Sequence, residues 1–454
     1  MISAEIPSSR RRWTLVWALA SSLGQAWAAG AGEPAAAAPP RIELAAAAQI
    51  FREAASLSAR DGGKLWGVAL YGPMLLIEPD SRFLVGNQAD RNGMLQAHGE
   101  VFTGTLPAQE QFANTAASWS GVLWTQMMWP LPQDPARRDT LIAHELFHRI
   151  RGELHLPELR ITGNAQLDTL QGRYLLQLEW RALSRALGAP RAADRRAAAG
   201  DAMLFRAQRY RLFPAAREEE NNLEYNEGLA EYTGVRAGCE GHDAQLQAAQ
   251  RDLTVHVQDP SFVRSFAYAT GPAYGLLLDE YLPAWRQRLA GGTPLDLLLA
   301  QALHVSFPGD LAAPVKARSV LYDGAPLLQS ETLRESERQK RLADYRRTFI
   351  EQPVLVLPLQ HVQVQFDPRD VQSFEEHGSV YPSLTVSDDW GILHVEKGAL
   401  VDPAWHAVTV SAPASTTDRH LAGQGWTLEV NPGWKLVPGA RQGDFTVAGP
   451  DKKL

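Results

Sequence analysis

Residues 135–151, PARRDTLIAHELFHRIR, constrain the fold and the chemistry of this chain more than any other stretch. Asp134 followed by proline is typical of a helix start, because aspartate caps free N–H groups and proline fits the first helical position. Residues four apart share a helix face, so His144 and His148 project together and can hold two corners of a tetrahedral zinc ion. Glu145 lies beside them, where its carboxylate can take a proton from a metal-bound water. A solvated face with two unrelated histidines is the alternative.

Residues 222–235, NLEYNEGLAEYTGV, predict a second helix that ends near Gly238. Glu224, Glu227 and Glu231 would line one face of this helix, where stacked carboxylates repel one another by a few tenths of a kcal/mol per pair. A metal ion with its two histidines would relieve that repulsion. We expect Glu227 to be the third ligand, with Glu224 and Glu231 as the next candidates. A solvated acidic face is the alternative, although the leucines and tyrosine among the glutamates disfavour full exposure.

Together, HELFH at 144–148 and NEGLAEY at 226–232 resemble the gluzincin zinc metallopeptidases, the clan of thermolysin and aminopeptidase N. The resemblance implies a third zinc ligand on a second helix, commonly preceded by asparagine. Glu227, preceded by Asn226, stands at that position. In one respect the chain departs from the pattern, because the stretch between the two motifs is far longer than in thermolysin or aminopeptidase N.

The same resemblance implies roles for two further residues. Glu231, four residues after the third ligand, matches an acidic residue that supports a ligand histidine, and we expect it to contact His144. Tyr268, in the sequence Tyr-Ala-Thr-Gly, matches a tyrosine that stabilises the oxyanion in the aminopeptidase N branch. Tyr274 is the substitute for this role. A packed core aromatic is the alternative interpretation of Tyr268.

Residues 1–28 are predicted to be a cleaved signal peptide rather than part of the fold. Three arginines at 10–12 precede an apolar core at 13–20, and an Ala-Trp-Ala cleavage site ends at Ala28. The apolar core is too short to span a bilayer, and no later stretch reaches about 18 uninterrupted apolar residues. An ordinary Sec signal is favoured over a twin-arginine signal, so a bacterial periplasmic or secreted protein is expected.

The net charge limits the kinds of partner expected for this chain, and the cysteine count limits the cellular compartments. The net charge of −7 becomes more negative once the arginine-rich signal is removed, which disfavours nucleic acid and anionic membranes as partners. The single cysteine, Cys239, leaves no pair for an intrachain disulfide and fits a bacterial periplasm better than a eukaryotic extracellular space. We expect Cys239 to be a buried small hydrophobe rather than a nucleophile.

The order of the predicted elements indicates an α+β fold. After a flexible leader at 29–40, residues 41–350 are expected to form a zincin-like catalytic domain. Its N-lobe (41–151) would hold a twisted sheet and the active-site helix, and its remainder (152–350) would be mainly helical. Alternating strands then predict a small all-β domain, a sandwich or barrel, at 353–454.

The expected N-lobe strands follow a helix at 42–59 and are short. We expect strands at 65–71, 74–78, 82–86, 100–105 and 118–128. In the gluzincin clan an edge strand holds the substrate backbone, and residues 119–128 are the candidate for this role. The alternative is that Trp119, Trp124 and Trp129 simply form part of the core.

Later helices and strands follow from the same periodicities. Helices are expected at 165–187, 191–211, 274–288 and 331–350. Strands are expected at 354–366, 383–386, 391–395, 406–410, 425–430 and 444–448. Four histidines in the β region stand at no ligand spacing, and we expect them to be ordinary surface or hydrogen-bonded residues: His361, His377, His394 and His406.

We therefore expect an exported zinc-dependent metallopeptidase in which Glu145 activates a zinc-bound water against a peptide carbonyl. Its partner would be a peptide or protein substrate, and the oligomeric state stays open. One alternative is an inactive zincin-fold binding or assembly protein, which the intact Glu145 disfavours because a pure binding site needs no general base. Another alternative is a zinc hydrolase of non-peptide amides or esters.

Overall fold

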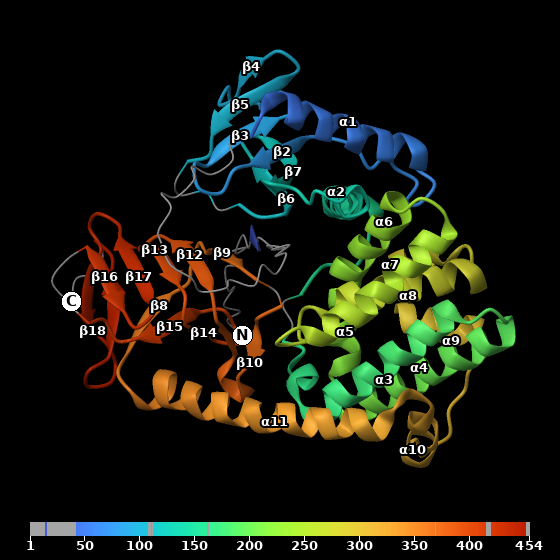
Figure 1. Ribbon diagram of the computed structural model, residues 1–454. Coiled ribbons are helices and arrows are strands. Elements are labelled where there is room, and N and C mark those ends of the chain that lie inside the picture. The colour runs from blue at the N-terminus through green and yellow to red at the C-terminus, as the bar shows by residue number, and fades with distance from the viewer. Residues whose placement is uncertain are drawn as a thin grey trace, which may run out of the picture.

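The computed structural model describes residues 42–107, 110, 112–160, 163–367, 369–414 and 419–450, together with the backbone of a two-residue strand, β1 (Thr14–Leu15). About 49% of the chain is helical and 19% is strand, so the fold is mixed α+β, and its C-terminal region is β (Figure 1). The signal peptide predicted at 1–28 and the leader predicted at 29–40 lie outside the described residues, apart from β1.

An N-terminal sheet of six strands occupies the top of Figure 1, in the order β4-β5-β3-β2-β7-β6. β7 runs parallel to β2, and β6 is an antiparallel edge strand. One face of the sheet packs against α1 (Leu44–Asp61) and α2 (Pro135–Ile150) through a shared apolar core. The strands are β2 (Met74–Ile77), β3 (Phe83–Gly86), β4 (Gln96–His98), β5 (Val101–Thr105), β6 (Thr115–Trp119) and β7 (Val122–Met128).

Two strand predictions in this region are wrong. Residues 65–71 lie in turns and irregular backbone. Residues 118–128 do not form one strand, because Ser120 (φ 48°) and Gly121 (φ 80°) make a two-residue turn between β6 and β7. Two consecutive positive φ values suit a tight hairpin turn. β7 therefore lies inside the sheet, and the edge strand is β6 instead of residues 119–128.

The tryptophans of this hairpin belong to the core. Trp124 is fully buried and Trp119 is nearly so, and both pack with apolar residues on the sheet face away from α1. Trp129, after β7, is partly buried against the core on the opposite face. The hairpin therefore offers its backbone edge, rather than these indole rings, to any ligand.

Helix α2 begins as predicted, because the Asp134 side chain accepts a hydrogen bond from the Arg137 N–H at 2.9 Å and proline follows the cap. It packs against α6 (Leu229–Gly238). A Cβ at Gly238 would lie 2.5 Å from the Thr140 nitrogen, and a Cβ at Gly234 would lie 2.7 Å from the Thr140 oxygen, so both positions require glycine. This close approach brings the histidines of α2 against the glutamates at the start of α6.

Most of the helices that follow α2 lie on the right of Figure 1, and α11 runs along the bottom. One rod consists of α5 (Ala216–Leu223), a π-helical turn, η3 (Glu224–Gly228), and α6. The other helices of this part are α3 (Leu170–Gly188), α4 (Ala192–Leu212), α7 (His242–Val255), α8 (Phe266–Tyr281), α9 (Leu295–Ala302), α10 (Ala312–Ser319) and α11 (Gly324–Arg346). Short helical turns are η1 (Arg151–Leu154), η2 (Ala165–Asp168), η4 (His256–Gln258), η5 (Trp285–Gly291), η6 (Val320–Tyr322), η7 (Arg347–Glu351) and η8 (Glu375–His377).

The helix predicted at 274–288 differs most from the structure. α8 begins eight residues earlier, at Phe266, so the Tyr-Ala-Thr-Gly sequence lies inside it, and it ends at Tyr281. Pro272 is accommodated within the helix. This early start matters for function, because it turns Tyr268 into a helical residue that faces the η3 turn.

Two sheets form the C-terminal region, in the orders β1-β9-β12-β13-β17-β16 and β10-β11-β14-β15-β8-β19-β18. Apolar side chains of both sheets share one core, in which Phe366 of one sheet meets Tyr381 of the other at 4.9 Å between ring centres. The strands are β8 (Val354–Pro358), β9 (Gln363–Phe366), β10 (Gln372–Ser373), β11 (Ser379–Tyr381), β12 (Leu384–Asp388), β13 (Gly391–Val395), β14 (Ala399–Val401), β15 (Ala407–Ser411), β16 (His420–Gly423), β17 (Trp426–Val430), β18 (Lys435–Pro438) and β19 (Phe445–Ala448).

The single strand predicted at 354–366 is wrong. It is broken into β8 and β9, which belong to different sheets. The break is stabilised by Asp388, whose carboxylate accepts hydrogen bonds from the backbone N–H groups of Gln360 and His361 at 2.8 and 3.2 Å. The alternating pattern continues through the turn, which is why the two strands looked like one.

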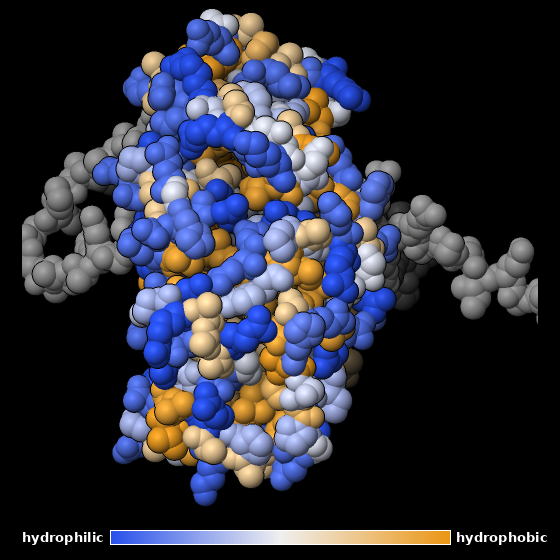
Figure 2. Space-filling view, turned by 90° about the vertical axis from the view of Figure 1, so that its right-hand side faces the viewer, coloured by the Kyte–Doolittle hydropathy of each residue, from blue (hydrophilic) through white to orange (hydrophobic). Residues whose placement is uncertain are grey.

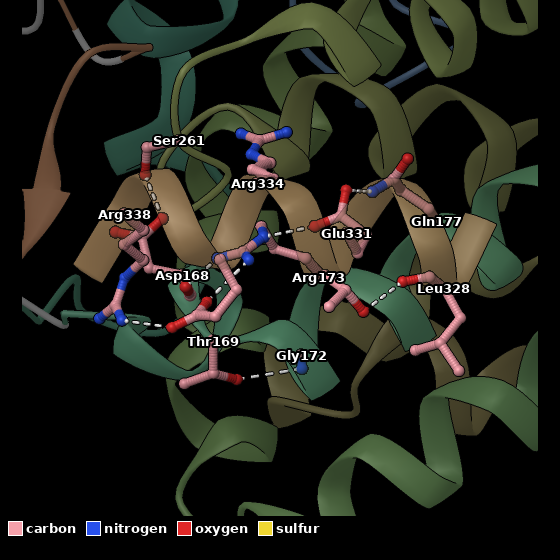
Figure 3. Close-up of polar contacts among 12 residues, drawn as sticks. Asp168, Thr169, Gly172, Arg173, Gln177, Ser261, Leu328, Glu331, Arg334 and Arg338 are labelled. Carbon is pink, nitrogen blue, oxygen red and sulfur yellow. Dashed lines mark hydrogen bonds and ion pairs between the residues drawn. The ribbon is translucent and has the colours of Figure 1, made fainter. Parts of the chain in front are cut away.

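Polar contacts around Asp168 join the helices to one another, as Figure 3 shows, and to a strand of the C-terminal region. The buried Asp168 carboxylate accepts hydrogen bonds from Ser261 Oγ and from the Ser373 N–H, both at 2.7 Å. Next to it, Arg173 Nε donates to Glu331 Oε2 at 2.6 Å and so ties α3 to α11 (Figure 3). α11 is therefore a strut held along its length rather than a free linker.

The face in Figure 2 mixes hydrophilic and hydrophobic residues without one continuous apolar area. None of the helices in the described part of the chain combines the length and apolar character that a membrane span requires.

A cavity of about 730 Å³ lies at the C-terminal ends of α3, α6 and α8 and the start of α7. Its charged side chains pair with one another, as Arg195 does with Glu280 at 3.1 Å, and it holds none of the residues predicted for the metal site.

Candidate metal centre

Three side chains from two helical segments point their donor atoms at one place. His144 Nε2 and His148 Nε2, both from α2, lie 3.1 Å apart. Glu227 Oε2, from η3, lies 3.5 Å from the first nitrogen and 3.6 Å from the second. The side chains of His144 and Glu227 are buried, and that of His148 is 9% exposed.

The donor atoms fit a zinc ion. Zinc binds imidazole nitrogen and carboxylate oxygen at about 2.0–2.1 Å with tetrahedral geometry, which places neighbouring donors about 3.3–3.4 Å apart. The three separations of 3.1, 3.5 and 3.6 Å fall on both sides of this value. Three protein ligands also leave a fourth position for water or substrate, as catalytic zinc sites require.

Glu231 contacts the outer nitrogen of the first histidine. Its Oε2 atom lies 2.6 Å from His144 Nδ1, and its side chain is 17% exposed. A carboxylate at this nitrogen accepts its N–H and leaves the Nε2 lone pair free for a cation. The structure thus places Glu231 on the histidine for which the sequence predicted it.

Two residues hold the third donor. Asn226 Nδ2 donates to Glu227 Oε1 at 2.6 Å, and the Tyr268 hydroxyl donates to Glu227 Oε2 at 2.7 Å. Burial and the nearby Glu227 carboxylate raise the pKa of Tyr268 well above its ordinary value, so the hydroxyl stays protonated. The Tyr268 ring also stacks on His144, with 5.8 Å between ring centres. In this structure Tyr268 therefore contacts two of the three residues that point their donor atoms at one place.

Glu145 is fully buried, and neither of its carboxylate oxygens has a hydrogen-bond partner among the described residues. Burial raises its pKa to about 8; His144 opposes this shift, and Glu227 and Glu231 add to it. A buried carboxyl group without protein donors is costly to ionise, and its oxygens stay unpaired unless it serves another group. A proton acceptor beside a metal-bound water is such a use.

The ligands influence one another electrostatically. Burial disfavours the charged form of His144, but the carboxylates of Glu227 and Glu231 outweigh it and raise its pKa well above the ordinary value. Burial lowers the pKa of His148, although Glu227 opposes the shift. Burial would raise the pKa of Glu227, but the two histidines dominate and lower it. The third donor is therefore a carboxylate, the form that binds a cation.

The prediction that Glu224, Glu227 and Glu231 line one helix face is wrong. Glu224 points away from the histidines and accepts two hydrogen bonds from Arg206, at 2.6 and 3.0 Å, and one from Thr270 at 2.8 Å. The reason is the π-helical turn η3, whose wider winding rotates residues after Glu224 relative to an unbroken α-helix. Glu224 is therefore not placed to be a ligand, and its charge is balanced by arginine rather than by a metal.

A glycine on α8 permits the contact with this turn. A Cβ at Gly271 would lie 2.1 Å from the carbonyl oxygen of Gly228, so α8 and η3 touch backbone to backbone. The approach puts Tyr268 on Glu227 and Thr270 on Glu224. The Tyr-x-x-Gly spacing thus has a physical reason in this chain.

Behind the turn lies a buried ionic network that the sequence analysis missed. Arg206 Nε donates to Glu179 Oε1 at 2.8 Å, and Arg209 binds Glu179 and Glu220 at 2.8 and 2.7 Å. All of these side chains are 0–1% exposed. Tyr274, the substitute for the oxyanion role, belongs to this network, because its hydroxyl donates to Glu179 at 2.8 Å. The structure does not bring Tyr274 to the histidines.

A second missed feature is the pair His256 and Asp259. His256 Nδ1 lies 2.6 Å from Asp259 Oδ2, and the His256 ring stacks on Tyr268 with 6.0 Å between ring centres. The spacing of three residues was the only sequence signal for the pair, and such a spacing is common on surfaces. Its position places an imidazole behind the tyrosine of the candidate site.

Two other groups of three possible ligands occur among the described residues, both in the C-terminal region. They are His361 with Asp388 and Asp389, and Glu375 with Glu376 and His377. Most of these side chains are exposed, and exposed acidic groups of this kind are common without a metal. His361 is accounted for by its contact with Asp389 at 2.9 Å.

Two imidazoles and a carboxylate surround one point, and the buried Glu145 follows His144 directly in the chain. This is the combination of donors and neighbouring acid group that hydrolytic zinc sites use. No protein-family model, curated protein or solved structure matches the chain.

Proposed function

We propose that the chain is a zinc-dependent hydrolase of peptide bonds, with a zincin-like arrangement of an N-terminal sheet, the α2 histidine helix and a second ligand helix. One observation carries the proposal above all. His144, His148 and Glu227 converge with separations suited to one zinc ion, and the buried Glu145 beside them has no other partner. The resemblance of the two motifs to gluzincin metallopeptidases supports the same function.

A zinc ion bound there would supply a water of pKa about 7 and polarise the substrate carbonyl. Glu145 would accept a proton from that water and later deliver it to the leaving amine. Its freedom from protein hydrogen bonds supports this role, because nothing in the described residues competes for its lone pairs. Tyr268, whose hydroxyl donates to Glu227 Oε2 at 2.7 Å, is the proposed oxyanion donor, and losing one such donor typically costs about 3–4 kcal/mol of transition-state stabilisation.

The edge strand β6 is the proposed platform for an extended substrate. It packs against α2, and its outer edge carries no partner strand in the described part of the chain. An extended peptide can add to such an edge through backbone hydrogen bonds. The substrate platform predicted at 119–128 is thus reassigned to residues 115–119, which form the first strand of the same hairpin.

The test has two steps on purified protein. Metal analysis should find one zinc ion per chain. The wild type should cleave peptides in a mixed library, and Glu145→Gln should not. Zinc without cleavage of any peptide would point to the hydrolase of non-peptide amides or esters, or to the inactive binding protein. Absence of stoichiometric zinc would reject the proposed metal centre and with it the proposed function.

A further inference from the structure

Arg151 shares the face of α2 that carries the two histidines. Residues at i, i+4 and i+7 of a helix lie on one stripe, and His144, His148 and Arg151 have this spacing. Helix α2 ends at Ile150, but the backbone of Arg151 keeps helical angles (φ −51°, ψ −38°), so the stripe continues to it. A guanidinium group therefore follows the proposed metal ligands by one helical turn.

The guanidinium is only partly used by the protein. Its Nη2 atom donates to the Pro157 carbonyl at 2.6 Å, while its Nε atom is buried without a hydrogen-bond partner among the described residues. An arginine Nε–H buried in this way lacks the hydrogen bond that it would make with water. A ligand oxygen could supply that bond if the side chain shifted enough to uncover the Nε–H.

The charge of Arg151 acts on the candidate site. Burial lowers the pKa of Arg151, and the Glu227 carboxylate reduces this shift. Arg151 is also among the groups that lower the pKa of His148, after the larger effect of burial. Both effects place the guanidinium within electrostatic range of two of the three proposed ligands.

Arg149 shows that a buried Nε atom without a partner does not by itself identify a ligand-binding arginine. Its Nη2 atom donates to the Leu70 carbonyl at 2.7 Å, and its Nε atom is likewise buried without a partner among the described residues. Arg149 stands next to His148 on the chain but on a different helix face, against Gly72. What distinguishes Arg151 is its position on the histidine stripe.

We propose that Arg151 binds a carboxylate of the substrate that lies at the metal centre, so that the protein prefers peptides with a negative charge close to the scissile bond. The inference rests on the proposed function, because it assigns a substrate class to the same site. A guanidinium matches a carboxylate better than any other side chain does, since its N–H groups form a planar fork. The carboxylate has two possible sources, a peptide C-terminus and an aspartate or glutamate side chain.

Binding to the zinc-loaded Glu145→Gln protein tests the inference without relying on hydrolysis. The probes are N-acetylated peptides of one sequence with a free or an amidated C-terminus, and doubly blocked peptides with glutamate or glutamine at each position. A charge-assisted hydrogen bond predicts binding about 10–100-fold tighter for one charged member over its neutral partner. The C-terminal pair and the internal pairs show which carboxylate is recognised.

Substitutions of Arg151 in the same background give the decisive comparison. Arg151→Met should abolish the difference between charged and neutral peptides, Arg151→Lys should restore part of it, and Arg149→Met should leave it intact. Equal binding of charged and neutral peptides, a difference that survives Arg151→Met, or no binding of any probe would overturn the inference. Loss of zinc affinity in Arg151→Met with an unchanged peptide preference would also overturn it and make Arg151 a charge compensator.

Cleavage of the same peptides by the wild type separates the two proposals. Cleavage combined with equal binding of charged and neutral probes would reject the role of Arg151 and leave the proposed function in place. Preference for charged probes without any cleavage would keep the carboxylate site and reject the peptidase.

Discussion

Glu231 Oε2 lies 2.6 Å from Nδ1 of His144, on the side of the imidazole opposite to the nitrogen that faces His148 and Glu227. The contact fixes which nitrogen of His144 carries the proton and holds the ring in position. Glu231→Ala should therefore weaken zinc affinity about 10–100-fold without abolishing binding. Competition against a chelator of known affinity measures the change.

Glu231→Gln is the matched variant, because an amide keeps the size and one oxygen acceptor while losing the charge. Its zinc affinity should lie between those of the wild type and Glu231→Ala. Unchanged affinity in both variants would return Glu231 to an ordinary solvated glutamate. Complete loss of zinc would instead make it a direct ligand.

Glu145→Gln should keep zinc and the fold but lose hydrolytic activity. The substitution preserves the volume of a fully buried side chain and removes its ability to accept a proton. Zinc content, thermal unfolding and turnover on any cleaved peptide should be measured on the same preparation. Equal turnover by the variant and the wild type would exclude Glu145 as the general base.

Tyr268→Phe separates two roles of one hydroxyl. If the hydroxyl stabilises the oxyanion, as we predict, kcat should fall by about 10²–10³-fold while zinc content at saturating metal is unchanged. If it serves only to orient Glu227, to which it donates at 2.7 Å, zinc affinity should fall and kcat of the fully loaded enzyme should stay the same. Measuring zinc affinity and kcat together decides between these results, and the second one would contradict our prediction.

Arg206 should be essential for stability and for the shape of the η3 turn. It is buried between Glu179 and Glu224, and removing one partner of a buried ion pair costs about 3–5 kcal/mol because it leaves an uncompensated charge. Arg206→Met should lower the unfolding free energy by about that amount, as measured by denaturant unfolding. Arg347→Met is the control, because its ion pair with Asp344 is exposed and should contribute little.

Zinc affinity of the folded Arg206→Met protein extends this test. Glu224 belongs to the same turn as Glu227, so releasing it should also disturb the third ligand. A variant that is destabilised but binds zinc with wild-type affinity would confine Arg206 to a structural role. A variant as stable as the wild type would show that removing Arg206 leaves no costly uncompensated charge.

The sequence predicted those parts of the site that depend on local spacing. The start of α2 follows from Asp134 and the proline after it, and the common face of His144 and His148 follows from helical periodicity. These two inferences need only a few consecutive residues. The contact of Glu231 with His144 joins distant segments, and it could be anticipated only because the two motifs resemble those of gluzincins.

Features that depend on contacts between distant segments could not be predicted in this way. The π-helical turn that rotates Glu224 onto Arg206 has no signature in the local sequence, and Arg206 stands on a different helix. The hairpin turn at Ser120 and Gly121 was hidden because apolar residues continue through it. Likewise, the sequence left Tyr274 open as the substitute for Tyr268, and only their common helix shows that the two hydroxyls reach different carboxylates.

Zinc stoichiometry of the purified protein tests the central claim most directly. Metal analysis of the wild type, His148→Ala and Glu227→Ala, with His361→Ala as a surface control, should be made after dialysis against metal-free buffer. We predict one zinc per chain in the wild type and in His361→Ala, and a sharp loss in the other two variants. Stoichiometric zinc in both His148→Ala and Glu227→Ala would contradict the metal centre proposed for this chain.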